Sequence, residues 1–371
     1  MRKPGAMIVV SVLLCASLFA LNNRSAVSLT GSDLATCTVP DPCRTFDVAI
    51  SKTNAGGEVV VLSTAGYGPF TVTKSVSVIS PPAYHAAMAP TAGAAITINT
   101  AGVTVILRNL YLNSLGAPTG IAMTADASVV HVENLVINGF TGNGIEANGN
   151  FSATSQMFIK DTEVRSSGQS GIFAGPSAGK LTLAVDRTRL EANGYGVVVD
   201  SGVEMVMRDS TVLNSLSFGV WVRNNGGLAV VANAWVDRSM STQNVAVGFL
   251  TDFGGLLTIS NSVAARNSDG FRAENFSQLA ADHCVASDNT NGFLLVDGAT
   301  MTVSKSMATR NSADGIAAIN SGTAFVSENT VTKNIVGLHV TGTAVMESIS
   351  NNMVRGNTTN VSGTVTAVAA N

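Results

Sequence analysis

A repeat of 22 to 23 residues in the C-terminal third of the chain constrains the fold more than any other feature. Each unit carries apolar residues two positions apart, a polar residue, a short run of β-formers, an asparagine and a glycine followed by an apolar residue, as in LLTISNSVAARNSDGFRAENFSQ from residue 256. Aligned on the polar position, successive units give Asn261, His283, Lys305, Glu328 and Asn351. This period, with apolar alternation inside each unit, predicts a β-solenoid whose stacked coils share one core.

The same register extends toward the N-terminus with looser spacing. We expect the polar column to continue backwards through Asn233, Asp209, Arg187, Asp161, Asn134 and Asn109. A glycine followed by an apolar residue recurs ten times in one phase, at Gly120, Gly144, Gly171, Gly196, Gly219, Gly248, Gly270, Gly292, Gly315 and Gly337. The spacing stretches to 28 residues between Asn233 and Asn261, which places an insertion at 237–244. The unbroken repeat predicts one elongated domain, although 371 residues would also suit two.

Composition agrees with a sheet-rich repeat and disfavours some partners. Only 12% of residues are charged, against about a quarter in a typical globular domain, and 36 are glycine. The net charge is −3 without a basic cluster, so we expect no nucleic-acid partner. We also expect no cofactor and no metal, because the four histidines show no ligand spacing.

The first 57 residues predict that the protein is exported and that a cap precedes the first coils of the solenoid. Residues 1–26 resemble a secretory signal peptide, with Arg2 and Lys3 ahead of an apolar core at 6–21 that is shorter than the roughly 20 residues of a membrane span. We therefore expect no membrane span after cleavage, and a secreted, periplasmic or surface protein. Residues 27–57 then hold a disulfide loop, with Cys37 paired to Cys43, and a capping helix at 45–54. The solenoid is expected over 58–371.

The sequence also predicts the boundaries of the capping helix and the burial of Cys284. Phe46, Ala49 and Ile50 share one helix face, Thr45 caps its start, and the glycines at 56 and 57 end it. Cys284 follows the polar column at a position that serine holds in neighbouring coils. We expect a buried, unreactive thiol there.

These patterns resemble the right-handed parallel β-helix proteins of the pectate-lyase-like superfamily. The resemblance covers roughly residues 40–360 and rests on the repeat form seen in 259–271 and on PCRTFDVAI followed by GGEVVVL. It implies an all-β, right-handed parallel β-helix of about eleven coils with a short N-terminal capping helix. The superfamily includes polysaccharide lyases, glycoside hydrolases, uronate epimerases, adhesins and phage tail proteins, so the fold alone does not select a function.

The sequence lacks the motifs that would select among these activities. The Asp-Pro-His motif of mannuronan epimerases is absent, as are the Asn-Thr-Asp, Asp-Asp and Gly-His-Gly motifs of polygalacturonases. No catalytic residue can therefore be transferred to this chain.

The strand that follows each repeated glycine offers the best candidate surface. If the apolar residue after the glycine points inward, the next residue points outward. The first outward column is then Ala122, Glu146, Phe173, Val198, Trp221, Leu250, Arg272, Leu294, Ala317 and His339. A second outward column lies two residues on: Thr124, Asn148, Gly175, Asp200, Arg223, Asp252, Glu274, Val296, Ile319 and Thr341.

This surface has two interpretations. Alternating charges could form a ladder that supports strand pairing, with the apolar strip covered by a loop. Alternatively, the face could be a carbohydrate-binding groove in which an aromatic ring packs on the sugar and charged groups bind its polar atoms. The candidate residues are Trp221, Phe173, Asp200, Arg223, Asp252, Arg272 and Glu274. By contrast, Asn267, Asn289, Asn311 and Asn334 are expected to stack at a turn in a structural role.

Three functions remain open from the sequence. The first is a secreted or surface β-helix protein that interacts with an extended polysaccharide. The second is a polysaccharide lyase or glycoside hydrolase with an unrecognised site. The third is a structural or adhesive solenoid without enzymatic activity. The oligomeric state is not specified by the sequence.

Overall fold

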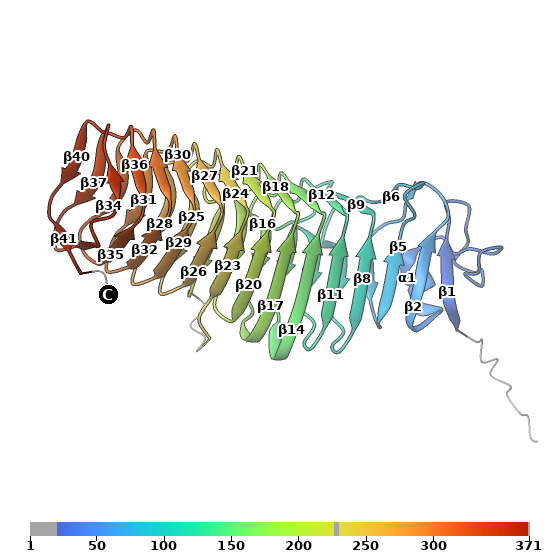
Figure 1. Cartoon of the computed structure of the whole chain (residues 1–371). Helices are drawn as coiled ribbons and strands as arrows, with labels where there is room; N and C mark the ends of the chain where they lie inside the picture. The colour runs from blue at the N-terminus through green and yellow to red at the C-terminus, as the bar shows by residue number, and fades with distance from the viewer. Residues whose placement is uncertain (1–20, 226–229, 370–371) are drawn as a thin grey trace, which may run out of the picture.

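Three parallel sheets wind into one solenoid in the computed structural model, which describes residues 21–225 and 230–369 (Figure 1). The first sheet contains β1 (Asn22–Val27), β2 (Thr53–Val61), β5 (Val76–Ile79), β8 (Thr104–Arg108), β11 (Val129–Glu133), β14 (Asn150–Lys160), β17 (Ala178–Asp186), β20 (Val203–Arg208), β23 (Asn233–Asp237), β26 (Leu256–Ser260), β29 (Gln278–Asp282), β32 (Thr300–Ser304), β35 (Thr323–Ser327), β38 (Val345–Ser348) and β41 (Val365–Ala367).

The other two sheets are made of shorter strands. The second sheet contains β3 (Ala65–Gly66), β6 (Ala86–Met88), β9 (Leu110–Asn113), β12 (Val136–Asn138), β15 (Glu163–Arg165), β18 (Arg189–Glu191), β21 (Thr211–Leu213), β24 (Met240–Thr242), β27 (Val263–Ala265), β30 (Val285–Ser287), β33 (Met307–Thr309), β36 (Thr330–Thr332) and β39 (Met353–Val354). The third sheet contains β4 (Phe70–Val72), β7 (Ala94–Ile98), β10 (Thr119–Met123), β13 (Ile145–Ala147), β16 (Ser170–Ala174), β19 (Tyr195–Val199), β22 (Val220–Arg223), β25 (Val247–Asp252), β28 (Asp269–Ala273), β31 (Asn291–Leu295), β34 (Asp314–Ala318), β37 (Val336–Val340) and β40 (Thr359–Ser362).

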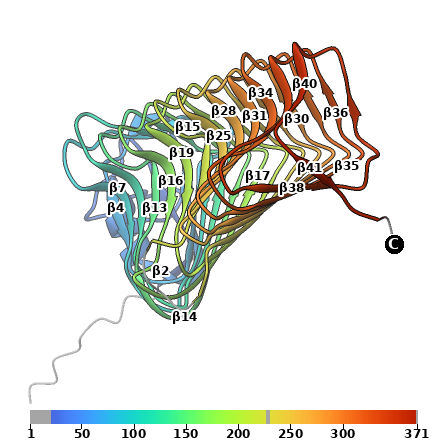
Figure 2. The same cartoon turned by 90° about the vertical axis from the view of Figure 1, so that its left-hand side faces the viewer.

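The predicted parallel solenoid is confirmed, with more coils than expected. Each coil contributes one strand to each sheet, and the sheets form the three walls seen along the axis in Figure 2. The 13 strands of the third sheet correspond to 13 coils rather than about eleven. The difference arises before residue 103, where the irregular segments also complete coils. Even the proline-containing stretch 81–90 contains a strand, β6.

The core runs the length of the solenoid between the three walls. The inward residues of each strand are buried, including Leu257 and Ile259 of β26. Phe249, Phe271 and Phe293 follow one another in successive coils of the third sheet, with ring centroids 5.2 and 4.7 Å apart. Apolar burial repeated in every coil is the main contribution to stability, at about 25 cal/mol per Å² of buried apolar surface.

The polar column occupies the turn between the first and second sheets. Asn261, His283, Lys305 and Glu328 adopt a left-handed backbone there, with φ between 48 and 55°. Two expected members are wrong. Asn233 begins β23 and pairs with Glu204 and Leu256, and Arg238 (φ 44°) holds the turn instead. Asn351 is one residue too late, and Ser350 (φ 62°) has the left-handed backbone in that coil. The sequence favoured Asn233 because asparagine tolerates this conformation better than arginine.

The insertion also lies elsewhere than expected. Residues 237–244 form the end of β23, a turn and β24 with the ordinary coil geometry. The extra residues are at 224–232, between β22 and β23, whereas only 253–255 join β25 to β26. The wrong polar residue in the alignment moved the apparent insertion to the other side of β23.

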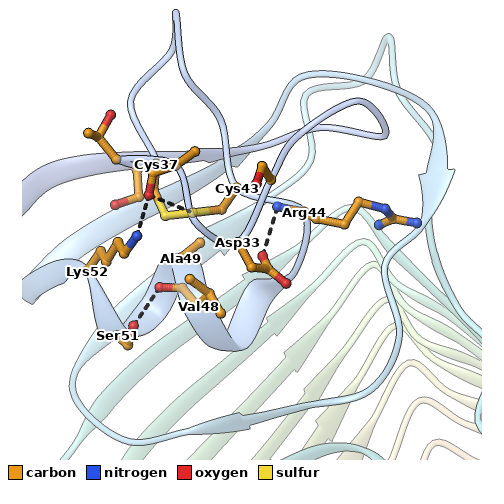
Figure 3. Close-up of a disulfide and its surroundings, with 12 residues drawn as sticks. Asp33, Cys37, Cys43, Arg44, Val48, Ala49, Ser51 and Lys52 are labelled. Carbon is orange, nitrogen blue, oxygen red and sulfur yellow. Dashed lines mark hydrogen bonds between the residues drawn. A yellow bond between two sulfur atoms is a disulfide. The ribbon is translucent and has the colours of Figure 1, made fainter.

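A short helix and a disulfide cover the N-terminal coils (Figure 3). The helix α1 (Phe46–Ser51) is capped by Thr45 and buries Phe46, Ala49 and Ile50, as expected. It ends earlier than expected, because Lys52 leads directly into β2. The Cys37–Cys43 disulfide is present, with Cα atoms 4.6 Å apart, and Lys52 Nζ donates to the Ala35 carbonyl beside it.

The strand β1 was not expected from the sequence. It pairs with β2 as the first strand of the first sheet, and its residues overlap the end of the segment 1–26 expected to be a signal peptide. Residues 1–20 of that segment lie outside the described residues. The signal peptide therefore stays a prediction, and cleavage ahead of Asn22 is the position that would leave β1 whole.

The burial expected for Cys284 is confirmed. Its side chain is 1% exposed, and its backbone N–H donates to Ser306 Oγ of the next coil at 3.0 Å. Burial raises the pKa of its thiol to about 12, so thiolate is scarce at neutral pH.

Candidate functional site

The outward face of the third sheet carries the two columns expected from the sequence. Strand pairing places Phe173, Val198, Trp221 and Leu250 next to one another in successive coils. Arg223 pairs with Asp252 in the second column. A cavity of about 380 Å³ opens on this face over β13, β16, β19 and β22, and it is lined by Asn143, Glu146, Asn148, Gln169, Ser170, Phe173, Tyr195, Val198, Trp221 and Arg223.

Trp221 lies at one end of this cavity inside an aromatic cluster. Its ring centroid is 5.5 Å from that of Tyr195 and 5.0 Å from that of Phe218. The side chain points outward, as expected, but these neighbours leave it half-buried rather than fully exposed. Its indole Nε1 is buried and has no hydrogen-bond partner among the described residues, a state that costs about 1 to 3 kcal/mol for a polar group.

Arg223 packs against the same ring and is fixed by a carboxylate. Its guanidinium carbon lies 4.2 Å from the centroid of Trp221, and its Nε donates to Asp200 Oδ2 at 3.0 Å. Asp200 is 8% exposed and also accepts from the backbone N–H groups of Ser201 and Asn225. Asp200 therefore positions Arg223 and the start of the 224–232 segment, and it does not line the cavity.

Asp252, Arg272 and Glu274 form a separate cluster over β25 and β28. The guanidinium of Arg272 lies 2.6 Å from Glu274 and 3.1 Å from Asp269. Asp252 is 4% exposed and accepts from Asn275 Nδ2 at 2.8 Å. Burial raises the pKa of Glu274, while the nearby Arg272 acts in the opposite direction.

The seven candidate residues thus separate into two groups. Phe173, Trp221 and Arg223 line the cavity, and Asp200 holds Arg223 from behind. Asp252, Arg272 and Glu274 lie one or two coils further on. Both interpretations of the sequence describe part of this face, since Asp200 and Arg223 form an ion pair and Val198 and Leu250 are 2% and 1% exposed.

Seven of the ten residues that line the cavity were not among the candidates chosen from the sequence. Glu146, Asn148 and Val198 lie in the two predicted columns but were not chosen. The other missed residues are Asn143, Gln169, Ser170 and Tyr195. Asn143, Ser170 and Tyr195 directly precede the repeated glycines, and Ser170 pairs with Tyr195 across the strands. The available signal was the aromatic pair Tyr195 and Phe218 at this same position in successive coils.

The cavity lining combines amides, hydroxyls and aromatic rings with the carboxylate of Glu146 and the guanidinium of Arg223. Side-chain amides and a hydroxyl can both donate and accept hydrogen bonds, and the aromatic rings offer apolar faces. Among residues 21–225 and 230–369, no group of three or more histidine, cysteine or acidic side chains is arranged to hold a metal ion. Within the same ranges, no helix has the length and hydrophobicity to cross a bilayer.

Comparison with known proteins identifies the same type of fold. A family model described as "Right handed beta helix region" matches residues 177–335 and, overlapping them, 257–359. No match is found among curated protein sequences.

Similar solved structures cover most of the chain at low identity. One is a variant of the periplasmic alginate epimerase AlgG, with a TM-score of 0.57 and 10% identity over 79% of this chain and 77% of that one. Another is the A-module of a mannuronan C-5 epimerase of Azotobacter vinelandii, with a TM-score of 0.57 and 13% identity over 88% of this chain and 97% of that one. At these identities the similarity establishes the fold alone.

Proposed function

We propose that this chain, a right-handed parallel β-helix of the pectate-lyase-like type, binds an extended polysaccharide along the outward face of its third sheet. The observation that carries the proposal is the cavity of about 380 Å³, which combines three aromatic side chains with amide and hydroxyl groups. A sugar ring can pack its C–H face on an aromatic ring while its hydroxyls bond to the amides around it.

The architecture suits a polymer better than a small molecule. The cavity spans four successive strands of a sheet in which strands repeat at about 4.8 Å. A chain of sugar units bound there would lie along the solenoid axis, with Trp221 at one end of the contact. The similar structures act on alginate and mannuronan according to their names, which supports a polysaccharide ligand for a β-helix of this shape.

Residues with different roles should respond differently to substitution. Trp221→Ala removes the packing surface at one end of the cavity, and we expect it to weaken binding at least tenfold. Gln169→Ala changes an amide in the lining without touching the aromatic cluster and should weaken binding less. Affinity electrophoresis in gels that contain candidate polysaccharides, followed by isothermal titration calorimetry, measures both effects.

Trp235 supplies a matched control. It lies in β23 on the outward face of the first sheet and is 43% exposed. Trp235→Ala should leave binding unchanged, and circular dichroism of each variant verifies the fold. Binding that survives Trp221→Ala in a folded protein, or that depends on Trp235, would contradict the proposed site.

We also propose that the protein is exported. The disulfide in the N-terminal loop supports this, because such bonds persist mainly in oxidising compartments. N-terminal sequencing of the protein from the producing cell, with non-reducing peptide mapping of Cys37 and Cys43, tests the proposal. An uncleaved, reduced cytosolic protein would contradict it.

A further inference from the structure

The binding face of the third sheet has an excess of negative charge. Three columns face outward there: the two described above and a third formed by the residues that directly precede the repeated glycines. Six carboxylates lie in these columns: Glu146, Asp200, Asp252, Asp269, Glu274 and Asp314. Only two guanidiniums, those of Arg223 and Arg272, accompany them, so the three columns carry a formal charge of −4 with His339 neutral.

Both guanidiniums are already engaged by carboxylates of the same face. Arg223 bonds to Asp200 at 3.0 Å and packs on Trp221, so its planar face is covered. Arg272 contacts Asp269 and Glu274. At Arg272 a sugar carboxylate would have to displace Asp269 or Glu274 to gain an ion pair. Arg223 is bonded to Asp200 through Nε alone, so an anion at its terminal nitrogens would lie beside the fixed charge of Asp200.

The carboxylates cannot easily move away to accommodate an anion. Asp200, Asp252 and Asp269 are 8%, 4% and 4% exposed. Each is held by nitrogen donors, including Asn275 for Asp252 and Asn291 for Asp269. A fixed excess of negative charge on this face repels ligands of the same sign.

The cavity itself offers groups that suit uncharged sugars. Asn143, Asn148, Gln169 and Ser170 lie in the lining, and Glu146 accepts from Asn148 Nδ2 at 2.8 Å. Amides and hydroxyls pair with sugar hydroxyls or acetamido groups without needing a counter-charge.

We infer that the groove takes a neutral glycan, built of hexose, pentose or N-acetylhexosamine units, and discriminates against polyuronates. This inference rests on the proposed function and specifies its ligand class. It separates this chain from the epimerases with a similar fold, whose names state that they act on alginate and mannuronan.

The test compares neutral and anionic polymers on the same protein. The full chain is titrated against neutral glucans, xylan, mannan and chitin oligosaccharides, and against alginate and polygalacturonate, at 20 and 500 mM salt. The tightest neutral ligand should bind at least about tenfold more tightly than either polyuronate at low salt. The difference should narrow at high salt, where the Debye length falls to a few Å.

A charge variant sharpens the test. Glu146→Gln removes one carboxylate from the cavity lining and should improve any residual polyuronate affinity at low salt by about twofold to threefold, the effect of one unit charge at about 8 Å in water. It should change polyuronate affinity little at 500 mM salt.

The outcomes distinguish this inference from the proposed function. A polyuronate that binds as tightly as any neutral polymer, in a manner abolished by Trp221→Ala, overturns the ligand class and leaves the binding site standing. Absence of binding to every polymer, or binding that is insensitive to Trp221→Ala, overturns the proposed function and this inference together.

Discussion

The two halves of the solenoid differ in a buried column at the turn between the second and third sheets. In the C-terminal half the column is an unbroken asparagine ladder: Asn244, Asn267, Asn289, Asn311, Asn334 and Asn357. Each amide Nδ2 donates to Oδ1 of the next asparagine at 2.9 to 3.2 Å. Toward the N-terminus the column reads Ser167, Asn193 and Ser215, and the buried hydroxyls of both serines have no partner in the part of the chain that the structure describes.

The comparison shows what a side chain needs in order to join stacked coils. An asparagine amide is long enough to donate both to a backbone carbonyl and to the next amide, as Asn289 does with Ala264 O and Asn311 Oδ1. A serine hydroxyl is shorter and leaves its coil outside the ladder. Coil length is also less uniform there: the column steps 26, 22 and 29 residues from Ser167 to Asn244, and 22 or 23 afterwards. Length variation is thus concentrated where the ladder is broken.

The largest expected effect comes from breaking the continuous ladder. Asn289→Ala removes four side-chain hydrogen bonds and leaves the N–H of Asn267 without the acceptor that it has at 2.9 Å. We expect a loss of roughly 3 kcal/mol in the free energy of unfolding, since each buried polar group left unpaired costs about 1 to 3 kcal/mol. Urea denaturation followed by circular dichroism measures the loss.

The same substitution in the other half is the matched comparison. Asn193 makes two such bonds, accepting from Ser167 N and donating to Val164 O, so Asn193→Ala should cost about half as much. Equal losses of unfolding free energy at the two positions would show that the hydrogen bonds between neighbouring amides do not stabilise the protein.

A smaller effect, of opposite sign, is expected from extending the ladder. Ser215→Asn replaces the hydroxyl with an amide whose Nδ2 can donate to Asn244 Oδ1 in the next coil and whose Oδ1 can accept from Asn193 in the preceding coil, the direction seen along the rest of the ladder. Val212, three residues before position 215, should leave room for the new amide. Val331 and Asn334 have the same spacing, and both already pack close to Gly315. We expect a gain of about 1 kcal/mol, measured as a higher midpoint of urea denaturation. A loss of stability would mean that this coil is too tightly packed for the amide.

The smallest effect concerns exposed ion pairs at the turn between the first and second sheets, most of which lie in the N-terminal half. Hydrogen bonds from Arg187 and Arg238 lower the pKa values of Asp161 and Asp209, respectively. A carboxyl with a lowered folded-state pKa stabilises the protein above its unfolded pKa of about 3.9, and the contribution is lost as the pH falls through the folded value.

The Arg187→Gln, Arg238→Gln double variant should therefore lose slightly less thermal stability than the parent protein between pH 6 and pH 3. Differential scanning calorimetry at both pH values measures the difference. An identical acid sensitivity in the two proteins would show that these pairs contribute nothing, a common result for exposed ion pairs.

Much of the fold followed from the sequence because the repeat reports on backbone geometry directly. The glycine column is regular since a side chain is excluded there: a Cβ at Gly292 would lie 2.5 Å from the Gly315 carbonyl oxygen and 2.8 Å from Asn311 Nδ2. The inward positions, the asparagine stack and the burial of Cys284 were read from the same phase. The turn position of Arg238 and the strand β1 were not predicted. Arginine is an unusual residue for this turn, and β1 overlaps the segment that resembles a signal peptide.

The candidate site was less predictable for a physical reason. Strand alternation gave the direction of Trp221 and Arg223, but whether an outward side chain is free depends on its neighbours in adjacent coils. Asp200 and Leu250 point outward and are nonetheless 8% and 1% exposed. Gln169 reaches the cavity from a turn, where alternation gives no direction at all.

The parallel stacking also determines how the molecule carries mechanical load. The bonds between coils lie along the long axis, and the described chain begins at one end of the solenoid and finishes at the other (Figure 1). Tension between these ends would be transmitted through every coil in series, and an end coil, which has a neighbour on one side only, would detach first. The molecule should therefore extend in successive small steps, beginning from an end coil, and coils tied by the asparagine ladder should resist longer than those that lack it.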